Sequence, residues 1–274
     1  MRYCGVDVSA KPGQQRLVTL HERRGTDGTE LVATFYAPGT AADVAQTVLG
    51  FGGEAVVALD APSGPRLDLL AAGMPLRATL DLPDGRHELL RVAEALLYAR
   101  GLPLYPVPAG AQGSARWDAW LGQGFDLHAR LEALELFRPD ASHGHHLAAP
   151  AGDGALRLGR VCETYPDAAF SVLLGHRPPP KRTPWGLQQR IAALKLRAVV
   201  DDDGGLWQRT TEELDAAAAA YTAFALATGR ACWVGDPREG VIVLPVAALE
   251  PRYEPLPAPA RSRLSASPRP PSST

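Results

Sequence analysis

The sequence predicts an α/β fold: a mixed sheet with helices on both faces and a helical insertion. Three strand-like runs follow one another in the first forty residues, and only short turns separate them. Runs so close together can pair as antiparallel neighbours without a crossover. The later run EAVVALD is apolar on both faces, which is typical of a central strand covered by helices. The segment 211–228 then reads as a long helix, so both element types contribute to the core.

The N-terminal strands are expected near residues 2–9, 16–22 and 30–36. Lys11-Pro12-Gly13 supplies the first turn, and a Gly-rich segment supplies the second. The segment AADVAQTVLG, residues 41–50, has the apolar spacing of a helix. It ends at Gly50, and the central strand EAVVALD follows at 54–60.

The middle of the chain, 64–155, is less regular, and we interpret it as an insertion that covers the strand ends. Helices are expected at 86–100, before Gly101, and at 124–137. Turns rich in Pro and Gly separate them.

The second half returns to a regular pattern. LGRVCETYP reads as a strand ended by Pro166, and helices are expected at 167–174 and 185–197 on either side of the basic loop HRPPPKRTPWG. Thr210 and Glu213 have the spacing of a capping box at the start of the 211–228 helix, and Gly229 follows its end. ACWVG and GVIVLP are expected to form a hairpin. We therefore expect one domain over 1–250.

Beyond residue 250 the composition changes. The segment 251–274 is rich in Pro, Ser, Ala and Arg and has few large apolar residues. Such a segment cannot offset the entropy lost on ordering by burying apolar surface, so it is expected to be a disordered tail.

Composition narrows the choice of function classes. The net charge is −2 and the sequence pI is about 6.4, so nucleic-acid binding would need a local basic patch. The cysteines Cys4, Cys162 and Cys232 lie in apolar runs without metal-type spacing, and they are expected to be reduced core thiols. The chain begins on a strand pattern and has no window of 18 apolar residues. A cytoplasmic protein without membrane contact is expected.

Four acidic residues stand where an unpaired charge is costly: Asp7, Asp60, Glu163 and Asp215. Three of them end strand-like runs, and ligands of α/β folds commonly bind at strand ends. Alternation along the first strand puts Asp7 on the same face as Gly5, and this leads us to expect open space beside the carboxylate. Asp215 lies on a helix face of small residues that can pack close to a sheet.

Gathered carboxylates favour a hard divalent cation, so Mg²⁺ or Mn²⁺ is the expected cofactor. Such ions can activate a water and stabilise the leaving oxygen of a phosphodiester. Ser63, close after Asp60, is a candidate hydrogen-bond donor to the substrate. Lys181 and Arg182 are the candidate phosphate contacts, although a plain surface loop is an equal alternative.

An ordered series of motifs resembles the DUF429 family of predicted nucleases with an RNase H-like fold. The motifs are GVDVSA, VALDAPSGP, VCETYPDAAF, KRTPWG, ELDAAAAAYTA and WVGDPREGVIVLP, and they span most of 3–245. The resemblance implies a five-stranded mixed sheet with flanking helices, and it places Asp7, Asp60, Glu163 and Asp215 at the family's acidic positions. In the wider RNase H-like superfamily the last helix often carries acidic residues to the site. Glu212, three positions before Asp215, is therefore a possible fifth metal ligand, and Glu213 serves the cap.

Other patterns have structural interpretations that we prefer. The loop 143–146 contains three histidines, His143, His145 and His146, a residue type that binds metals. The loop is flanked by Gly and Pro and has no matching carboxylate nearby in sequence. Arg91 and Glu94 are expected to form a surface pair at i,i+3 spacing, with a phosphate contact as the alternative role of Arg91. The aromatic residues Trp117, Trp120 and Phe125 are expected in the core, with base stacking as the alternative.

Three function classes remain after these comparisons. The first is a metal-dependent nuclease or phosphodiesterase acting on DNA or RNA. The second is an ATP-dependent phosphotransferase of the actin-like and sugar-kinase type, which needs two such sheet units and fits a chain of 274 residues poorly. The third is a non-catalytic binding module on the RNase H-like fold. The four carboxylates favour the nuclease.

Overall fold

One mixed sheet organises the molecule. The computed structural model describes residues 1–25, 28–52, 55–71, 74–80, 87–102, 104, 106–108, 115–134 and 160–256. In this part of the chain the sheet has eight strands. They are β1 (Arg2–Asp7), β2 (Arg16–Arg24), β3 (Thr29–Tyr36), β4 (Ala55–Asp60), β5 (Val161–Thr164), β6 (Val199–Val200), β7 (Cys232–Asp236) and β8 (Gly240–Leu244).

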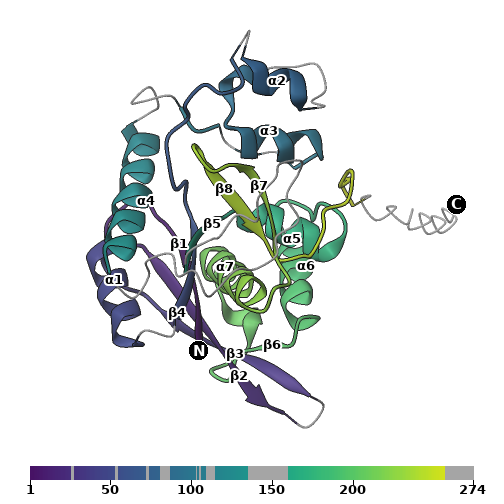
Figure 1. Ribbon diagram of the computed structural model, residues 1–274. Helices are drawn as coiled ribbons and strands as arrows, with labels where there is room; N and C mark the ends of the chain where they lie inside the picture. Colours follow the sequence, from purple (N-terminus) through teal and green to yellow (C-terminus); the bar gives the residue numbers. More distant parts are fainter. Residues whose placement is uncertain are drawn as a thin grey trace, which may run out of the picture.

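Helices connect and cover these strands (Figure 1). The α-helices of the described residues are α1 (Ala41–Gly50), α2 (Pro75–Thr79), α3 (Val92–Ala99), α4 (Ala115–Ala133), α5 (Pro166–Leu174), α6 (Pro184–Lys195) and α7 (Thr211–Ala227). The short 3-10 helices are η1 (His87–Leu89) and η3 (Leu206–Gln208). In the same residues, no helix combines the length and hydrophobicity needed to cross a lipid bilayer.

The strand order is β6-β3-β2-β1-β4-β5-β8-β7. The meander β1-β2-β3 is antiparallel, as predicted, whereas β4, β5 and β8 continue the sheet from β1 in parallel pairs. The sheet thus has eight strands where the family resemblance implied five. The added strands are the predicted β7–β8 hairpin, which pairs with the outer edge of β5, and β6, whose two residues are too short for a sequence pattern.

Side chains of alternate residues on the central strands enter two separate cores. Val18, Val56 and Ala58 pack with α5, α6 and α7 on one face of the sheet. Val6, Val57 and Leu59 pack with α1 and α4 on the other face. Figure 1 shows these two helical layers on opposite sides of the sheet. The predicted covering of both faces is therefore confirmed.

Helix α7 lies directly on β1. A Cβ atom built on Gly5 would lie 2.0 Å from the backbone nitrogen of Ala220 and 2.1 Å from the carbonyl oxygen of Ala216. Only a residue without a side chain fits between the two backbones. The open space expected beside Asp7 at Gly5 is thus absent, because the helix backbone fills it.

Helix α4 crosses the ends of β1 and β4. Trp120 donates its indole N–H to the carbonyl of Val8 at 2.9 Å. Gly124 lies against Ala61, and a Cβ atom built on Gly124 would be 2.7 Å from the Cβ of Ala61. The helix begins nine residues before the predicted start at 124. Its glycines weaken the sequence signal because glycine has a low helix propensity, yet Gly124 permits the close packing. The other predicted helix, 86–100, is shorter, since only 92–99 is α-helical.

Residues 251–256 are packed, although disorder was expected from 251. Tyr253 is 2% exposed, and its backbone N–H donates to the carbonyl of Arg100 at 2.8 Å. Leu256 donates likewise to Arg177 at 3.0 Å. One buried aromatic ring anchors this Pro-rich segment. The rest of the predicted tail, 257–274, lies outside the described residues.

The three cysteines are buried and free of disulfides, in agreement with the prediction of core thiols. Burial raises the pKa of Cys4 and of Cys162 to about 12 in each case, so neither is a reactive thiolate near neutral pH.

The contact between α7 and β1 gives a first prediction. Gly5→Ala should lower the free energy of unfolding by about 3 kcal/mol or more, because the clashing atoms belong to backbone that cannot move aside. Chemical denaturation would measure the change. The matched control is Gly122→Ala in α4, where no atom lies within 4 Å of the added Cβ. That substitution should be neutral or stabilising by up to about 1 kcal/mol. Equal stability of the two variants would contradict the packing described.

Candidate functional site

Two aspartates end the central pair of parallel strands. Asp7 closes β1 and Asp60 closes β4, and the two residues are direct partners in the strand register. Partners in a parallel pair point to the same face of the sheet, so both side chains leave it on the side of α7. The two side chains are close enough for the charge of Asp7 to raise the pKa of Asp60. Both residues are partly exposed.

Asp215 reaches the same place from α7. Thr210 caps this helix through the predicted capping box with Glu213, and Asp215 lies in the second turn with only 1% of its side chain exposed. Lys181 donates to its Oδ2 at 2.6 Å. Its Oδ1 is buried and has no hydrogen-bond partner among the described residues. A buried carboxylate oxygen without a donor is costly, so this atom marks a place where a ligand would be favoured.

Lys181 and Asp167 complete the group. The charge of Lys181 acts on Asp7, Asp60 and Asp215, and that of Asp167 acts on Asp60 and Asp215. Asp167 lies in the first turn of α5 and is held by Arg190 at 2.7 Å. Asp167 is not among the site residues predicted from the sequence. Its signal was available, since it directly follows Pro166 at the start of a helix close to a strand end.

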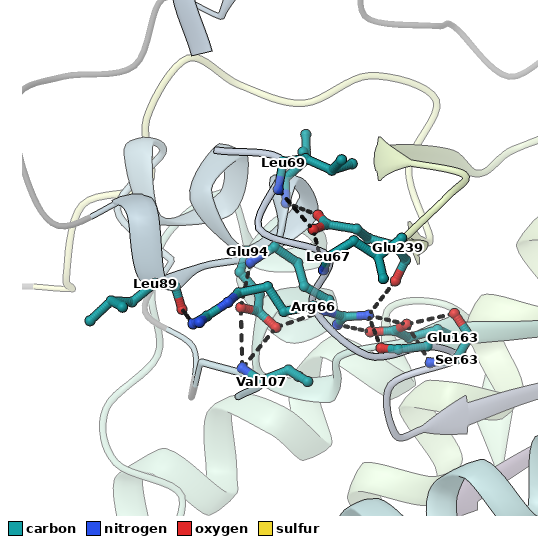
Figure 2. Close-up of polar contacts among 12 residues, drawn as sticks. Ser63, Arg66, Leu67, Leu69, Leu89, Glu94, Val107, Glu163 and Glu239 are labelled. Carbon is teal, nitrogen blue, oxygen red and sulfur yellow. Dashed lines mark hydrogen bonds and ion pairs between the residues drawn. The ribbon is translucent and has the colours of Figure 1, made fainter. Parts of the chain in front are cut away.

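Glu163 does not join these aspartates. It pairs in the strand register with Leu59, one residue before Asp60, so its side chain leaves the sheet on the opposite face. There Arg91 binds both of its carboxylate oxygens, at 2.5 and 3.0 Å. Ser63 donates its backbone N–H and its hydroxyl to Oε2 of Glu163, at 2.8 and 3.0 Å. Glu163 and Ser63, both predicted for the metal and substrate site, instead belong to this buried network (Figure 2).

Two further glutamates extend the Arg91 network. Glu94 accepts from Arg91 Nε at 2.9 Å and from the backbone of Val107, and burial raises its pKa. The carboxylate of Glu239 accepts backbone N–H groups of Leu67 and Val92 at 2.7 and 3.0 Å. The predicted i,i+3 pair of Arg91 and Glu94 therefore exists, but it is buried and not on the surface. The network joins the inserted segment to β5 and to the β7–β8 turn.

The remaining predicted residues lie at the edge of the aspartate group. Glu212 is exposed in the first turn of α7, where its charge contributes to the raised pKa of Asp7. Arg182 is also exposed, and its charge acts on Glu212. Neither is part of the buried group. We define the carboxylate cluster as Asp7, Asp60 and Asp215, with Lys181 and Asp167 beside it.

A comparison with protein-family models matches residues 5–239 to the family described as "Protein of unknown function (DUF429)". The chain belongs to the DUF429 family. Comparison with curated proteins gave no significant match, and neither did comparison with solved structures. In this DUF429 protein both the carboxylate cluster and the Arg91 network lie within the matched residues.

Burial, reinforced by repulsion between the carboxylates, raises the pKa values of the cluster. Burial, followed by the charge of Asp215, raises the pKa of Asp7 to about 7. Burial and then the charge of Asp7 raise the pKa of Asp60 well above its ordinary value. Burial raises the pKa of Asp215 to about 6 in spite of the opposing charge of Lys181. One lysine does not balance these acids, so the site favours added positive charge.

The donor set of the cluster fits a hard cation in part. Carboxylate oxygens are the ligands that Mg²⁺ and Mn²⁺ prefer, and the unpartnered Oδ1 of Asp215 is one such oxygen. In the described part of the chain, however, no three His, Cys, Asp or Glu side chains are grouped closely enough to hold a metal ion. Mg²⁺ usually binds through one or two carboxylates and completes its coordination with water and phosphate oxygens. The adjacent pair Asp7 and Asp60 meets that smaller requirement.

The other residues selected from the sequence either lie on α4 or fall outside the described residues. His143, His145 and His146 lie outside them. Trp117 and Trp120 are both on α4, with ring centroids 4.6 Å apart, and Trp120 packs against the core formed with α1. Phe125 is partly buried on the same helix.

The raised pKa values make stability depend on pH. An unfolded aspartate titrates near pH 4 (about 3.9), whereas Asp7 in the folded protein titrates at about 7. The folded state therefore binds more protons between these values, and the stability present below about pH 4 is lost as the pH rises through 7. Between about pH 5 and pH 8, Asp7→Asn should gain about 1 to 3 kcal/mol in unfolding free energy relative to wild type.

Urea denaturation with a chelator present would measure this pH dependence. The matched control is Asp126→Asn, which removes an exposed carboxylate of α4 and should follow the wild-type profile. Parallel profiles for Asp7→Asn and wild type would contradict the electrostatics of the cluster.

The Arg91 network gives a separate stability prediction. Arg91→Met should lower the free energy of unfolding by about 3 to 5 kcal/mol, because Glu163 and Glu94 would be left buried without their cation. Arg130→Met, which breaks an exposed pair on α4, should have little effect. The double variant Arg91→Met with Glu163→Gln should recover part of the loss in thermal or chemical denaturation. If Arg91→Met lowered the free energy of unfolding no more than Arg130→Met does, the network would not be needed for stability.

Proposed function

We propose that this DUF429 protein is a metal-dependent phosphodiesterase that hydrolyses DNA or RNA. The observation that carries the proposal is the carboxylate cluster, in which Asp7, Asp60 and Asp215 converge from two strand ends and a helix. Three acids with raised pKa values and one unpartnered oxygen form a site that positive charge would stabilise.

The residues have distinct roles in this proposal. Asp7 and Asp60 would hold Mg²⁺ or Mn²⁺. Asp215 would add a third negative charge beside them. The cation would supply neutralisation of the phosphate charge and activation of the attacking water. Lys181 fixes the orientation of Asp215 through its 2.6 Å bond and adds a positive charge that attracts phosphate. Glu163 is not assigned a catalytic role, since it serves Arg91.

The fold supports the same assignment. The central strands β3-β2-β1-β4-β5 combine the antiparallel meander with two parallel strands, and this mixed arrangement supports the proposal. We assign them as the RNase H-like unit of the protein. The acidic residues then lie at the ends of its two central strands and on its last helix.

A non-catalytic binding module is the second candidate. It is favoured by the ion pair of Lys181 with Asp215, which already satisfies one carboxylate oxygen within the protein. In a module of this kind the cluster would bind a cation weakly without turnover. The experiment below separates the two functions.

A cleavage screen tests the proposal. Purified protein with Mn²⁺ or Mg²⁺ is offered single-stranded, duplex, hybrid and branched DNA and RNA substrates. Wild type should cleave at least one class, and a chelator should abolish cleavage. Asp7→Asn and Asp60→Asn should each reduce the rate by about 100-fold or more, as expected when a charge-stabilising group of a transition state is removed.

Two controls make the outcome decisive. Asp126→Asn should retain full activity, because this residue is exposed on α4. Thermal denaturation of Asp7→Asn should show a folded protein, since the substitution removes repulsion within the cluster. Cleavage by Asp7→Asn at the wild-type rate, or cation binding by wild type without cleavage of any substrate, would refute the nuclease assignment.

A further inference from the structure

A cavity of about 730 Å³ opens beside the carboxylate cluster. Its walls come from the start of α5, the loop 176–183, the start of α6 and the packed segment 251–256. Lys181 and Asp167 line it, and Lys181 is also the residue that binds Asp215. Lys181 thus contacts both the cavity and the cluster, although the proposed hydrolysis makes no use of the cavity interior.

Aromatic and aliphatic side chains form much of the cavity wall. Trp185 and Tyr165 contribute rings, and Leu102, Leu104, Leu256 and a run of prolines contribute apolar surface. Pockets for small molecules typically have volumes of about 300 to 1,000 Å³, with mostly apolar walls and a few polar groups. The cavity has the size and lining expected for a single flat, partly apolar ligand.

One cation of the cavity, Arg177, can attract an anion. Arg177, Lys181 and Arg190 line it, against the single carboxylate of Asp167. Arg190 pairs with Asp167 and Lys181 pairs with Asp215. Arg177 donates to the carbonyl of Gly101 at 2.8 Å, a neutral acceptor that leaves its positive charge in place. Among the described contacts of these three cations, the positive charge of Arg177 is therefore the one that a carboxylate does not neutralise.

We propose that this cavity binds one nucleoside monophosphate unit, with the base against Trp185 and the phosphate near Arg177 and Lys181. A nucleotide combines the two properties that the walls require, a flat ring system and a nearby anion. The inference deepens the proposed function, on which it rests, because it places a nucleotide of the substrate next to the carboxylate cluster. The unit can be a free nucleotide or the end of a strand.

Binding in the absence of metal tests the inference separately from catalysis. With a chelator present, isothermal titration calorimetry would compare the four nucleoside monophosphates with a short single-stranded DNA, adenosine and ribose 5-phosphate. At least one monophosphate should bind more tightly than adenosine and ribose 5-phosphate. Tighter binding of the oligonucleotide would identify a strand end as the ligand, and equal binding would identify a free nucleotide.

Matched tryptophan variants locate the bound base. Trp185→Ala should weaken monophosphate binding by about fivefold or more, the loss expected when a base-stacking ring is removed. Trp185→Phe should restore most of it. Trp207→Ala, at a tryptophan that is 55% exposed outside the cavity, should bind as wild type does. Arg177→Met should weaken binding of the monophosphate but not of adenosine.

The possible outcomes distinguish the two proposals. No binding of any monophosphate by wild type, or wild-type affinity in Trp185→Ala, would overturn the nucleotide site even if cleavage is observed. Nucleotide binding that depends on Trp185 in a protein without cleavage would leave the site intact and refute only the nuclease.

Discussion

The contact between α7 and β1 is the constraint on which both the core and the candidate site depend. Gly5 brings the two backbones so close that a single added carbon would clash with Ala216 and Ala220. The alanines on the helix permit the same approach from the other side. Because of this contact, Asp215 at the second turn of α7 reaches the strand ends where Asp7 and Asp60 lie side by side. A bulkier contact surface would move the helix outward and Asp215 away from the other two.

Two groups of acids occupy opposite faces of the sheet, and their surroundings give them different roles. On the α3 side, Arg91 and several backbone N–H groups neutralise or bind Glu163, Glu94 and Glu239. These bonds hold the inserted segment in place. They also satisfy the three buried carboxylates without a bound ligand. On the α7 side, Lys181 bonds Asp215 and its charge acts on Asp7 and Asp60, yet all three pKa values stay raised and one oxygen of Asp215 has no partner in the described structure. The second group is therefore the one that a bound cation would stabilise.

Much of the fold followed from local patterns. The meander, the helix 41–50, the central strand and the capping box at Thr210 are each encoded by neighbouring residues, and the structure contains all of them. The expectations that failed did so for physical reasons. The glycines of α4 hide a helix that tertiary packing stabilises, and β6 is too short to leave a pattern. Tyr253 orders a segment whose composition alone favours disorder, because its side chain is buried in a cluster with Leu97 and Leu102 and its backbone N–H bonds the carbonyl of Arg100.

The sequence by itself determined which acids lie at strand ends and on the last helix, and it determined that Asp7 shares a strand face with Gly5. Only the tertiary structure decided which of those acids meet. The register of β5 against β4 is one residue away from placing Glu163 with Asp60, and a single residue reverses the face of a strand. The residues that bond these acids are also distant in sequence, since Arg91 lies 72 residues from Glu163 and Lys181 lies 34 residues from Asp215. Long-range register and packing therefore selected three of the four predicted carboxylates for the cluster and left Glu163 to the core.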